Sequence, residues 1–374
     1  LDQSVRSKFC ESSAESAVSR REAAIAKFLL AERMCRKTNG RLRPGVPVPY
    51  KDWDLNGILY SAEKKIHQVL GNFSWSEARE SMDFGPGATH LIRRGSASRA
   101  AKFDHRVETY LNSYLRCCWA VAQSPLWLEV ASASEPFLAP ANRVITVPKS
   151  SVIDRVIAIE PSTTMYCQKG IGKMIRRRLL RVGCDLNDQT YNGELARLGS
   201  QFGNLATVDL SMASDTIAYW LVRRLLPSDW FDALNELRAE RGVLPSGEFI
   251  AYQKFSSMGN GYTFELESLI FWAICSCVIE TLGLKDRRLG VYGDDIVISV
   301  HAKDLLERVL DYAGFKVNTS KSHWEGPFRE SCGKHYHSGV EVTPFYVRRP
   351  LDNVPDLFTY HKLAEVAGPC HGPT

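Results

Sequence analysis

The sequence predicts an α+β protein in which helices flank an antiparallel sheet. Two pairs of short β-rich runs, each pair joined by a tight turn, indicate two hairpins. Long segments with apolar residues at helical spacing lie before and between these hairpins. The chain has 374 residues, which is enough for two or three packed units.

The composition is that of a globular protein. Hydrophobic residues make up 44% of the chain and charged residues 24%, which excludes disordered, collagenous and membrane classes. The longest apolar stretch, 269–279, is too short to span a bilayer, so we expect a soluble protein with no membrane partner. Ten cysteines without a CxxC pair indicate reduced thiols in a reducing compartment. The net charge of +5 fits a polyanionic partner without requiring one.

In the first half, local patterns predict two helices and two loops. Apolar and basic residues segregate at helical spacing over 20–37. Pro and Gly mark loops at 43–49 and 83–88, and an Arg-rich helix is predicted over 174–182.

A hairpin precedes that second helix. β-branched runs at 144–147 and 152–159 flank a turn of four residues, 148–151. The hairpin carries Lys149 and Arg155, and basic side chains on a rigid hairpin can meet phosphates.

The second half carries acidic residues at the ends of strands. A short apolar strand over 205–210 contains Asp209 near its end and is followed by a helix over 216–226. A glycine-rich loop at 256–261 leads into an apolar helix over 262–282, so that backbone can approach a ligand closely before the helix begins.

The most specific pattern is a pair of carboxylates between two apolar strands. The runs 289–292 and 296–300 flank Gly293, Asp294 and Asp295, which is typical of a tight hairpin. Adjacent carboxylates in a half-buried turn repel each other unless a cation neutralises them. Oxygen ligands select Mg²⁺, or Mn²⁺, and carboxylates on neighbouring strands can bracket two such ions about 4 Å apart. This chemistry indicates phosphoryl or nucleotidyl transfer.

Together these motifs make the chain resemble a right-hand, template-dependent RNA polymerase. The resemblance is to the replicase catalytic subunits of positive-strand RNA bacteriophages, the leviviruses, and it covers roughly residues 50 to 349. The matching segments are Val208-Asp209-Leu210-Ser211-Met212-Ala213-Ser214-Asp215 for motif A, 256–267 for motif B, Val291-Tyr292-Gly293-Asp294-Asp295-Ile296 for motif C, 315–321 for motif D, 326–347 for the continuation into motif E, and Val147-Pro148-Lys149 with Asp154-Arg155 and Ile159-Glu160-Pro161 for the finger motif.

The resemblance implies a role for each matching side chain. Its catalytic ions would be held by Asp209 and Asp294, with Asp295 as a weaker ligand or a residue acting behind them. Binding of the incoming nucleotide would involve Asp215 at the ribose 2′-hydroxyl, Ser257 and Asn260 at the ribose or the template, and Lys149 and Arg155 at the triphosphate. Lys321 would protonate the pyrophosphate leaving group.

The resemblance also implies a division into domains. Residues 1–204 would form an N-terminal region and the fingers with some palm elements, and 205–348 the antiparallel palm with a fingers insertion near 228–255. Residues 349–374 would begin a thumb that is cut short. One position departs from many viral polymerases, because Glu267 stands four residues after Thr263 where those enzymes have Asn.

Two other functions compete with RNA synthesis on RNA. A reverse transcriptase shares the paired aspartates, but Gly293 before the pair and Asp215 in place of an aromatic ribose gate favour RNA synthesis. A palm-like RNA-binding protein without activity is opposed by three carboxylates that would repel RNA in the absence of metal. By resemblance, the partners are single-stranded RNA, ribonucleoside triphosphates, the host elongation factors Tu and Ts and ribosomal protein S1, all in the cytoplasm of a bacterial host.

Overall fold

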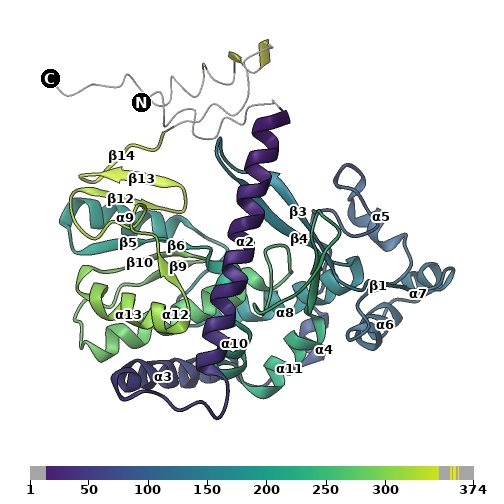
Figure 1. Cartoon of the computed structure of the whole chain (residues 1–374), viewed down its shortest axis with the longest axis horizontal. Helices are drawn as coiled ribbons and strands as arrows, with labels where there is room; N and C mark the ends of the chain where they lie inside the picture. The colour runs from purple at the N-terminus through teal and green to yellow at the C-terminus, as the bar shows by residue number, and fades with distance from the viewer. Residues whose placement is uncertain (1–13, 345–353, 356, 359–360, 362–374) are drawn as a thin grey trace.

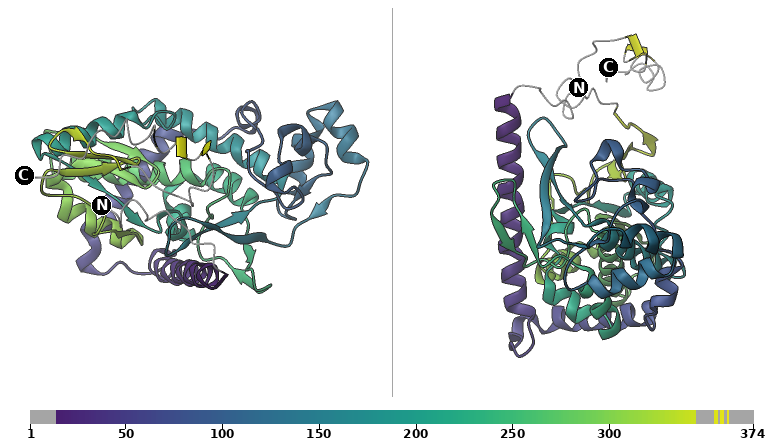
Figure 2. Two further views of the ribbon diagram at one scale, coloured as in Figure 1. Left: turned by 90° about the horizontal axis from the view of Figure 1, so that it is seen from above. Right: turned by 90° about the vertical axis from the view of Figure 1, so that its right-hand side faces the viewer.

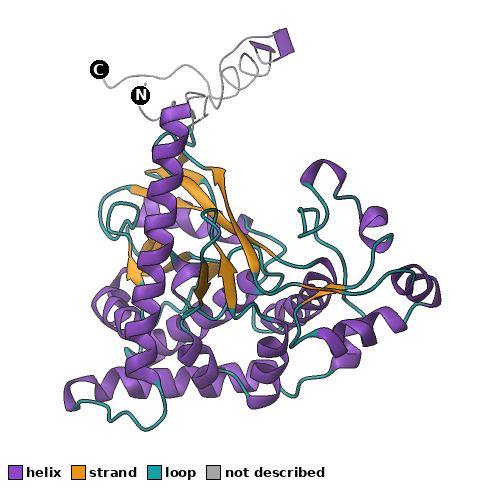
Figure 3. Cartoon of the chain, turned by 45° about the vertical axis from the view of Figure 1, so that its right-hand side comes forward, coloured by secondary structure: helices purple, strands orange, loops and turns teal. Residues whose placement is uncertain are grey.

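The computed structural model of the chain describes residues 14–344, 354–355, 357–358 and 361. Within them, helices surround several short β-sheets (Figures 1 and 3). The α+β class predicted from the sequence is confirmed by this arrangement. The segment predicted to begin a thumb, 349–374, lies almost entirely outside the described residues.

The central sheet has the strand order β5-β10-β9 and is antiparallel throughout. Its strands are β5 (Leu205–Val208), β10 (Asp295–Ser299) and β9 (Gly290–Tyr292). On β10, Ile296 and Ile298 belong to the main core, whereas Val297 packs with a separate cluster on the other face. Because successive side chains on a strand point to opposite faces, the sheet is covered on both sides. The predicted hairpin around Gly293 is confirmed.

The main core surrounds the buried helix α12 (Thr263–Thr281). This helix is apolar on nearly all sides, a pattern that suits a helix enclosed by others. It packs against helices that come from three regions of the chain. They are α3 (Trp53–Leu70), α8 (Ser162–Leu180) and α13 (Lys303–Ala313).

A second sheet has the order β4-β3-β7-β8. The predicted basic hairpin is confirmed as β3 (Asn142–Pro148) and β4 (Asp154–Ile159), paired antiparallel. Two strands from the predicted insertion near 228–255 complete this sheet. They are β7 (Arg241–Val243), parallel to β3, and β8 (Phe249–Ala251), antiparallel to β7.

The long helix α2 (Ala14–Leu42) lies along one side of the molecule (Figure 2). It contains the predicted helix 20–37 and extends beyond it at both ends. It packs against β4, α10 (Tyr219–Leu225) and the 3₁₀ turn Ala213–Thr216. The N-terminal helix therefore contacts the segment that follows Asp209.

The remaining elements surround these two sheets. Helix α9 packs on β5 and on the small antiparallel sheet β12-β13-β14, while α5, α6 and α7 project to the right in Figure 1. No helix among the described residues is long and apolar enough to cross a membrane. The bounds are α4 (Trp75–Arg79), α5 (Arg99–Phe103), β1 (Glu108–Thr109), α6 (Tyr114–Ala122), α7 (Pro125–Ser132), β2 (Phe137–Leu138), α9 (Thr190–Phe202), β6 (Leu210–Ser211), α11 (Ser228–Leu237), β11 (Lys316–Val317), β12 (Phe328–Ser331), β13 (Lys334–His337) and β14 (Val340–Glu341).

Three predicted bounds were wrong. The strand expected over 205–210 is split, because the chain leaves β10 after Val208 and pairs with β11 through β6. The helix expected from Thr216 begins at Tyr219, and α8 begins twelve residues before the predicted Met174, at Ser162.

Candidate active site

A cavity of about 400 Å³ lies where the two sheets, α2 and the β11 region meet. It brings together six of the nine side chains predicted for the site. They are Asp209, Asp294, Lys321, Asp215, Lys149 and Arg155. The chain segments that carry them are far apart in sequence, so only the fold assembles this set.

Asp209 occupies the junction between β5 and β6, where the chain changes from one strand partner to another. Its carboxylate Oδ2 accepts a hydrogen bond from Asn318 Nδ2 at 2.7 Å, and its carbonyl accepts one from the Asn318 backbone N–H at 2.9 Å. Its own backbone N–H donates to Ser322 Oγ at 3.1 Å. The segment after β11 therefore fixes the orientation of this carboxylate.

Asp294 lies in the turn between β9 and β10 and faces the same cavity. Burial raises the pKa of its carboxyl, and the neighbouring Asp209 carboxylate raises it further, while Lys149 and Arg155 act in the opposite direction. The Asp209 and Asp294 carboxylates thus repel each other, and the repulsion predicted between the adjacent Asp294 and Asp295 adds to the pKa of Asp295.

Asp295 is the first residue of β10 and does not line the cavity. Its Oδ1 accepts a hydrogen bond from the Cys332 backbone N–H at 3.2 Å. Burial, followed by the charge of Asp294, raises its pKa to about 7. Asp294 is a turn residue that lines the cavity, whereas Asp295 is held by the chain at Cys332 and does not.

Four exposed cations border the cavity, and one of them, Lys27 of α2, was not predicted. Lys149 and Arg155 come from the β3–β4 hairpin, and Lys321 comes from the segment after β11. Loss of hydration against the surrounding protein lowers the pKa of Lys149 most. The charges of Arg155 and Lys321 lower it further, whereas Asp294 raises it. These cations and the two carboxylates therefore act on the same space.

Asp215 lines the cavity from the 3₁₀ turn after β6 and is half-buried. Its Oδ1 accepts a hydrogen bond from Lys254 Nζ at 2.8 Å, in an ion pair whose lysine side chain is completely buried. Sequence reasoning missed Lys254, because no local pattern distinguishes a buried lysine near a strand end from a solvated one.

The structure does not bring Ser257 and Asn260 to this cavity. Both side chains are buried, at 3% and 8% exposure, and the same loop presents Met258 instead. Asn260 Oδ1 accepts a hydrogen bond from the Tyr262 backbone N–H at 3.0 Å, just before α12 begins. Asn260 borders a neighbouring cavity of about 510 Å³, which shares Phe264 with the first.

Glu267 is a further cavity residue that no role was predicted for. It is 6% exposed, and its Oε2 has no hydrogen-bond partner among the described residues. Burial raises its pKa well above the ordinary range, and Asp294 adds to this shift. Its spacing of four residues from Thr263 on one helix face was the signal that marked this position.

The site has two carboxylates at its centre and no larger metal-binding cluster. Among the described residues, no group of three or more His, Cys, Asp or Glu side chains is placed to hold a metal ion. Asp209 and Asp294 suit Mg²⁺ in its usual protein setting, where one or two carboxylates bind the ion and substrate phosphates and water complete its shell.

Comparisons with known proteins agree with this arrangement. A family described as "RNA replicase, beta-chain" matches residues 1–363. The chain is 43% identical over 346 residues to the RNA-directed RNA polymerase subunit beta of Enterobacteria phage SP, covering 90% of this chain and 58% of the relative. It is 43% identical to the same subunit of Escherichia virus Qbeta, covering 88% and 56%, and 48% identical to the RNA-directed RNA polymerase beta chain of Escherichia phage MS2, covering 81% and 56%. The chain thus spans a little over half the length of these relatives.

One solved structure supports the fold independently of sequence. The crystal structure of the RNA-dependent RNA polymerase of a human picobirnavirus superposes with a TM-score of 0.52 at 12% sequence identity. The match covers 92% of this chain and 70% of that one. At this identity the similarity concerns the fold alone.

Proposed function

The chain belongs to the RNA replicase beta-chain family, and from this premise we propose that it is an RNA-directed RNA polymerase that copies single-stranded phage RNA. The observation that carries the proposal is the cavity that Asp209 and Asp294 line together with Lys149, Arg155 and Lys321. Paired carboxylates beside cations suit transfer of a nucleotidyl group from a triphosphate.

The carboxylate pair fits two Mg²⁺ ions, and Mn²⁺ suits the same oxygen ligands. Asp209 and Asp294 would hold the ions, with Asp295 supporting them from behind the turn. The mutual repulsion that raises the pKa of Asp294 is relieved by a bound cation. When bound, such ions supply charge stabilisation to the attacking and leaving oxygens of an in-line displacement.

Different side chains around the ions bind different parts of the nucleotide. The exposed cations of the β3–β4 hairpin, Lys149 and Arg155, bind the triphosphate, and Lys321 from the segment after β11 donates a proton to the departing pyrophosphate. Asp215 accepts a hydrogen bond from the ribose 2′-hydroxyl, which a deoxyribose lacks. Ser257 and Asn260 support the glycine-rich loop behind this position.

The two sheets correspond to two parts of a right-hand polymerase. The sheet β5-β10-β9 is the palm within 205–348, and the sheet β4-β3-β7-β8 belongs to the fingers, which combine the N-terminal region 1–204 with the insertion near 228–255. The phage resemblance adds elongation factors Tu and Ts and ribosomal protein S1 as working partners in the bacterial cytoplasm.

The proposal is tested by incorporation of labelled ribonucleotides on a single-stranded RNA template. The purified chain with Mg²⁺ should synthesise RNA, alone or after addition of Tu and Ts. Asp294→Asn should abolish synthesis and leave RNA binding nearly intact, because it removes one ion ligand. Asp232→Asn removes the same charge at an exposed position outside the cavity and should retain full activity.

Three results would contradict parts of the proposal. Undiminished turnover by Asp294→Asn would remove the two-ion assignment, and preference for deoxynucleotides would identify a reverse transcriptase. Retained RNA binding without synthesis in any mixture would favour a protein that binds RNA without copying it.

A further inference from the structure

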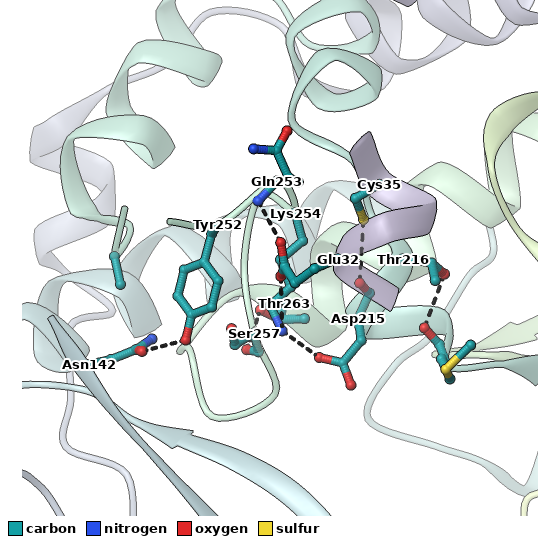
Figure 4. Close-up of polar contacts among 12 residues, drawn as sticks. Glu32, Cys35, Asn142, Asp215, Thr216, Tyr252, Gln253, Lys254, Ser257 and Thr263 are labelled. Carbon is teal, nitrogen blue, oxygen red and sulfur yellow. Dashed lines mark hydrogen bonds and ion pairs between the residues drawn. The ribbon is translucent and has the colours of Figure 1, made fainter. Parts of the chain in front are cut away.

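Lys254 is a buried cation that the proposed chemistry leaves without a role. Its side chain is 0% exposed and lies between two carboxylates, Asp215 at 2.8 Å and Glu32 at 3.7 Å (Figure 4). A buried ammonium is retained only where charged partners compensate for the loss of water. These two carboxylates supply that compensation.

Aromatic rings enclose the rest of the ammonium. Its Nζ lies 3.6 Å from the ring centre of Phe28 and 5.0 Å from that of Tyr252. Rings at these distances attract a desolvated cation and exclude water from it. The ammonium is therefore held at one place, with its charge directed at Asp215.

The backbone around Lys254 is tied to the segment that follows Asp215. Lys254 forms an antiparallel bridge with Ala218, and the Phe255 backbone N–H donates to the Ile217 carbonyl at 2.8 Å. The two partners of the ion pair thus belong to strands of chain that are fixed to each other.

Helix α2 closes this cluster from outside. Glu32 Oε2 accepts a hydrogen bond from the Gln253 backbone N–H at 2.6 Å, and Asn39 Nδ2 donates to the Gln253 carbonyl at 2.7 Å. Cys35 Sγ donates to the Asp215 carbonyl at 3.4 Å. With Phe28, these residues recur every three or four positions and form one face of α2.

Asp215 keeps one oxygen for a ligand. Lys254 occupies Oδ1, and no described residue donates a hydrogen bond to Oδ2. A carboxylate anchored by one oxygen presents the other in a fixed direction, which a hydroxyl-recognising site requires.

We propose that Lys254, braced by α2 through Glu32, is a positioning residue that holds the Asp215 carboxylate where it discriminates ribose from deoxyribose. The inference deepens the proposed function and rests on it. Lys254 does not touch the nucleotide, and it acts through Asp215 alone.

The test compares ATP with dATP in single-nucleotide incorporation by the full chain. Lys254→Met should lower the ratio of kcat/KM for ATP over dATP by about tenfold or more, with the dATP value nearly unchanged. A general structural role would lower both values together and leave the ratio as it was. In an Asp215→Ala background, adding Lys254→Met should change the ratio by less than about twofold, because the two residues act as one unit.

Two further variants keep the test decisive. Glu32→Gln keeps a side-chain oxygen that can accept the Gln253 backbone N–H and leaves the Lys254–Asp215 pair in place, so the brace is retained and the ratio should be preserved. If Lys254→Met does not fold, the double variant with Glu32→Gln removes the unpaired buried charge and should show the same loss of discrimination.

The outcomes separate this inference from the proposed function. If Asp215→Ala relaxes the ratio and Lys254→Met does not, the positioning role is wrong and the polymerase proposal stands. If Asp215→Ala leaves the ratio unchanged, the inference is wrong. If the parent incorporates no nucleotide, the proposed function fails, and calorimetric binding of ATP and dATP with Mg²⁺ applies the same comparison to the ratio of Kd values.

Discussion

The turn that carries Asp294 depends on a glycine that has little space around it. Gly293 has a φ of +63°, and a Cβ at this position would lie 2.7 Å from Phe264 Cε2 and 3.2 Å from Glu267 Oε1. A left-handed alanine costs about 1–2 kcal/mol, and forced overpacking adds about 1–3 kcal/mol. We therefore expect Gly293→Ala to lower the free energy of unfolding by about 2–5 kcal/mol.

A matched glycine separates the two contributions. Gly283, after α12, has a nearly equal φ of +60° but has no atom within 4 Å of its Cβ position. Gly283→Ala should therefore show the backbone strain alone, about 1–2 kcal/mol. Urea unfolding followed by tryptophan fluorescence measures both variants, and the excess cost of Gly293→Ala should shrink when Phe264 is replaced by Leu. Equal stability of the two alanine variants would refute the predicted contact at the turn.

Two further predictions concern stability away from the cavity. Burial, with help from Arg143, lowers the pKa of His90 to about 4 from 6.5, so the folded state excludes a proton that the unfolded state binds, and stability should fall as the pH drops from 6.5 towards 4. Urea midpoints at both ends of this range should show a smaller decline for His90→Gln, and an equal decline would contradict the assignment. Glu77→Ala breaks two contacts to Arg178, at 2.8 and 2.6 Å, and should cost about 2 kcal/mol, less than a fully buried pair because Glu77 keeps 27% exposure. Asp54→Ala, which breaks an exposed pair, should leave the urea midpoint nearly unchanged.

The carboxylate half of the site could be predicted because its signals are local. A run of apolar residues on each side of Gly293 determines the hairpin, and the hairpin determines where Asp294 lies. Asp295 does not line the cavity because its carboxylate accepts a hydrogen bond from the Cys332 backbone N–H, a contact that the apolar runs around the turn do not contain.

The start of helix α8 could not be predicted from the helix propensity of its residues. Gly170 and Gly172 weaken the helical pattern before Met174, and glycine is a poor helix former. In the structure, a Cβ at these positions would meet the Ala78 carbonyl at 2.6 Å and the Gly261 carbonyl at 2.7 Å. Close packing of neighbouring backbone requires the glycines there, and this tertiary requirement is absent from the local pattern.

The surroundings of Asp215 could not be predicted for the same kind of reason, and the wrong start of the helix at Thr216 shows why. The helix expected from Thr216 does not begin until Tyr219 because Ile217 and Ala218 pair with the chain around Lys254 instead. That pairing places a buried ammonium against Asp215, and Glu32 joins it from a helix more than two hundred residues away along the chain. The inner face of α2 therefore reaches Asp215 through Lys254 and through Cys35, whereas Asp209 is held by Asn318 and Ser322 and Asp294 lies in the β9–β10 turn. If Asp215 reads the ribose as proposed, changes on α2 that displace Lys254 should alter the choice of sugar before they alter the capacity for synthesis, whereas Glu32→Gln, which keeps the Lys254–Asp215 pair, should not.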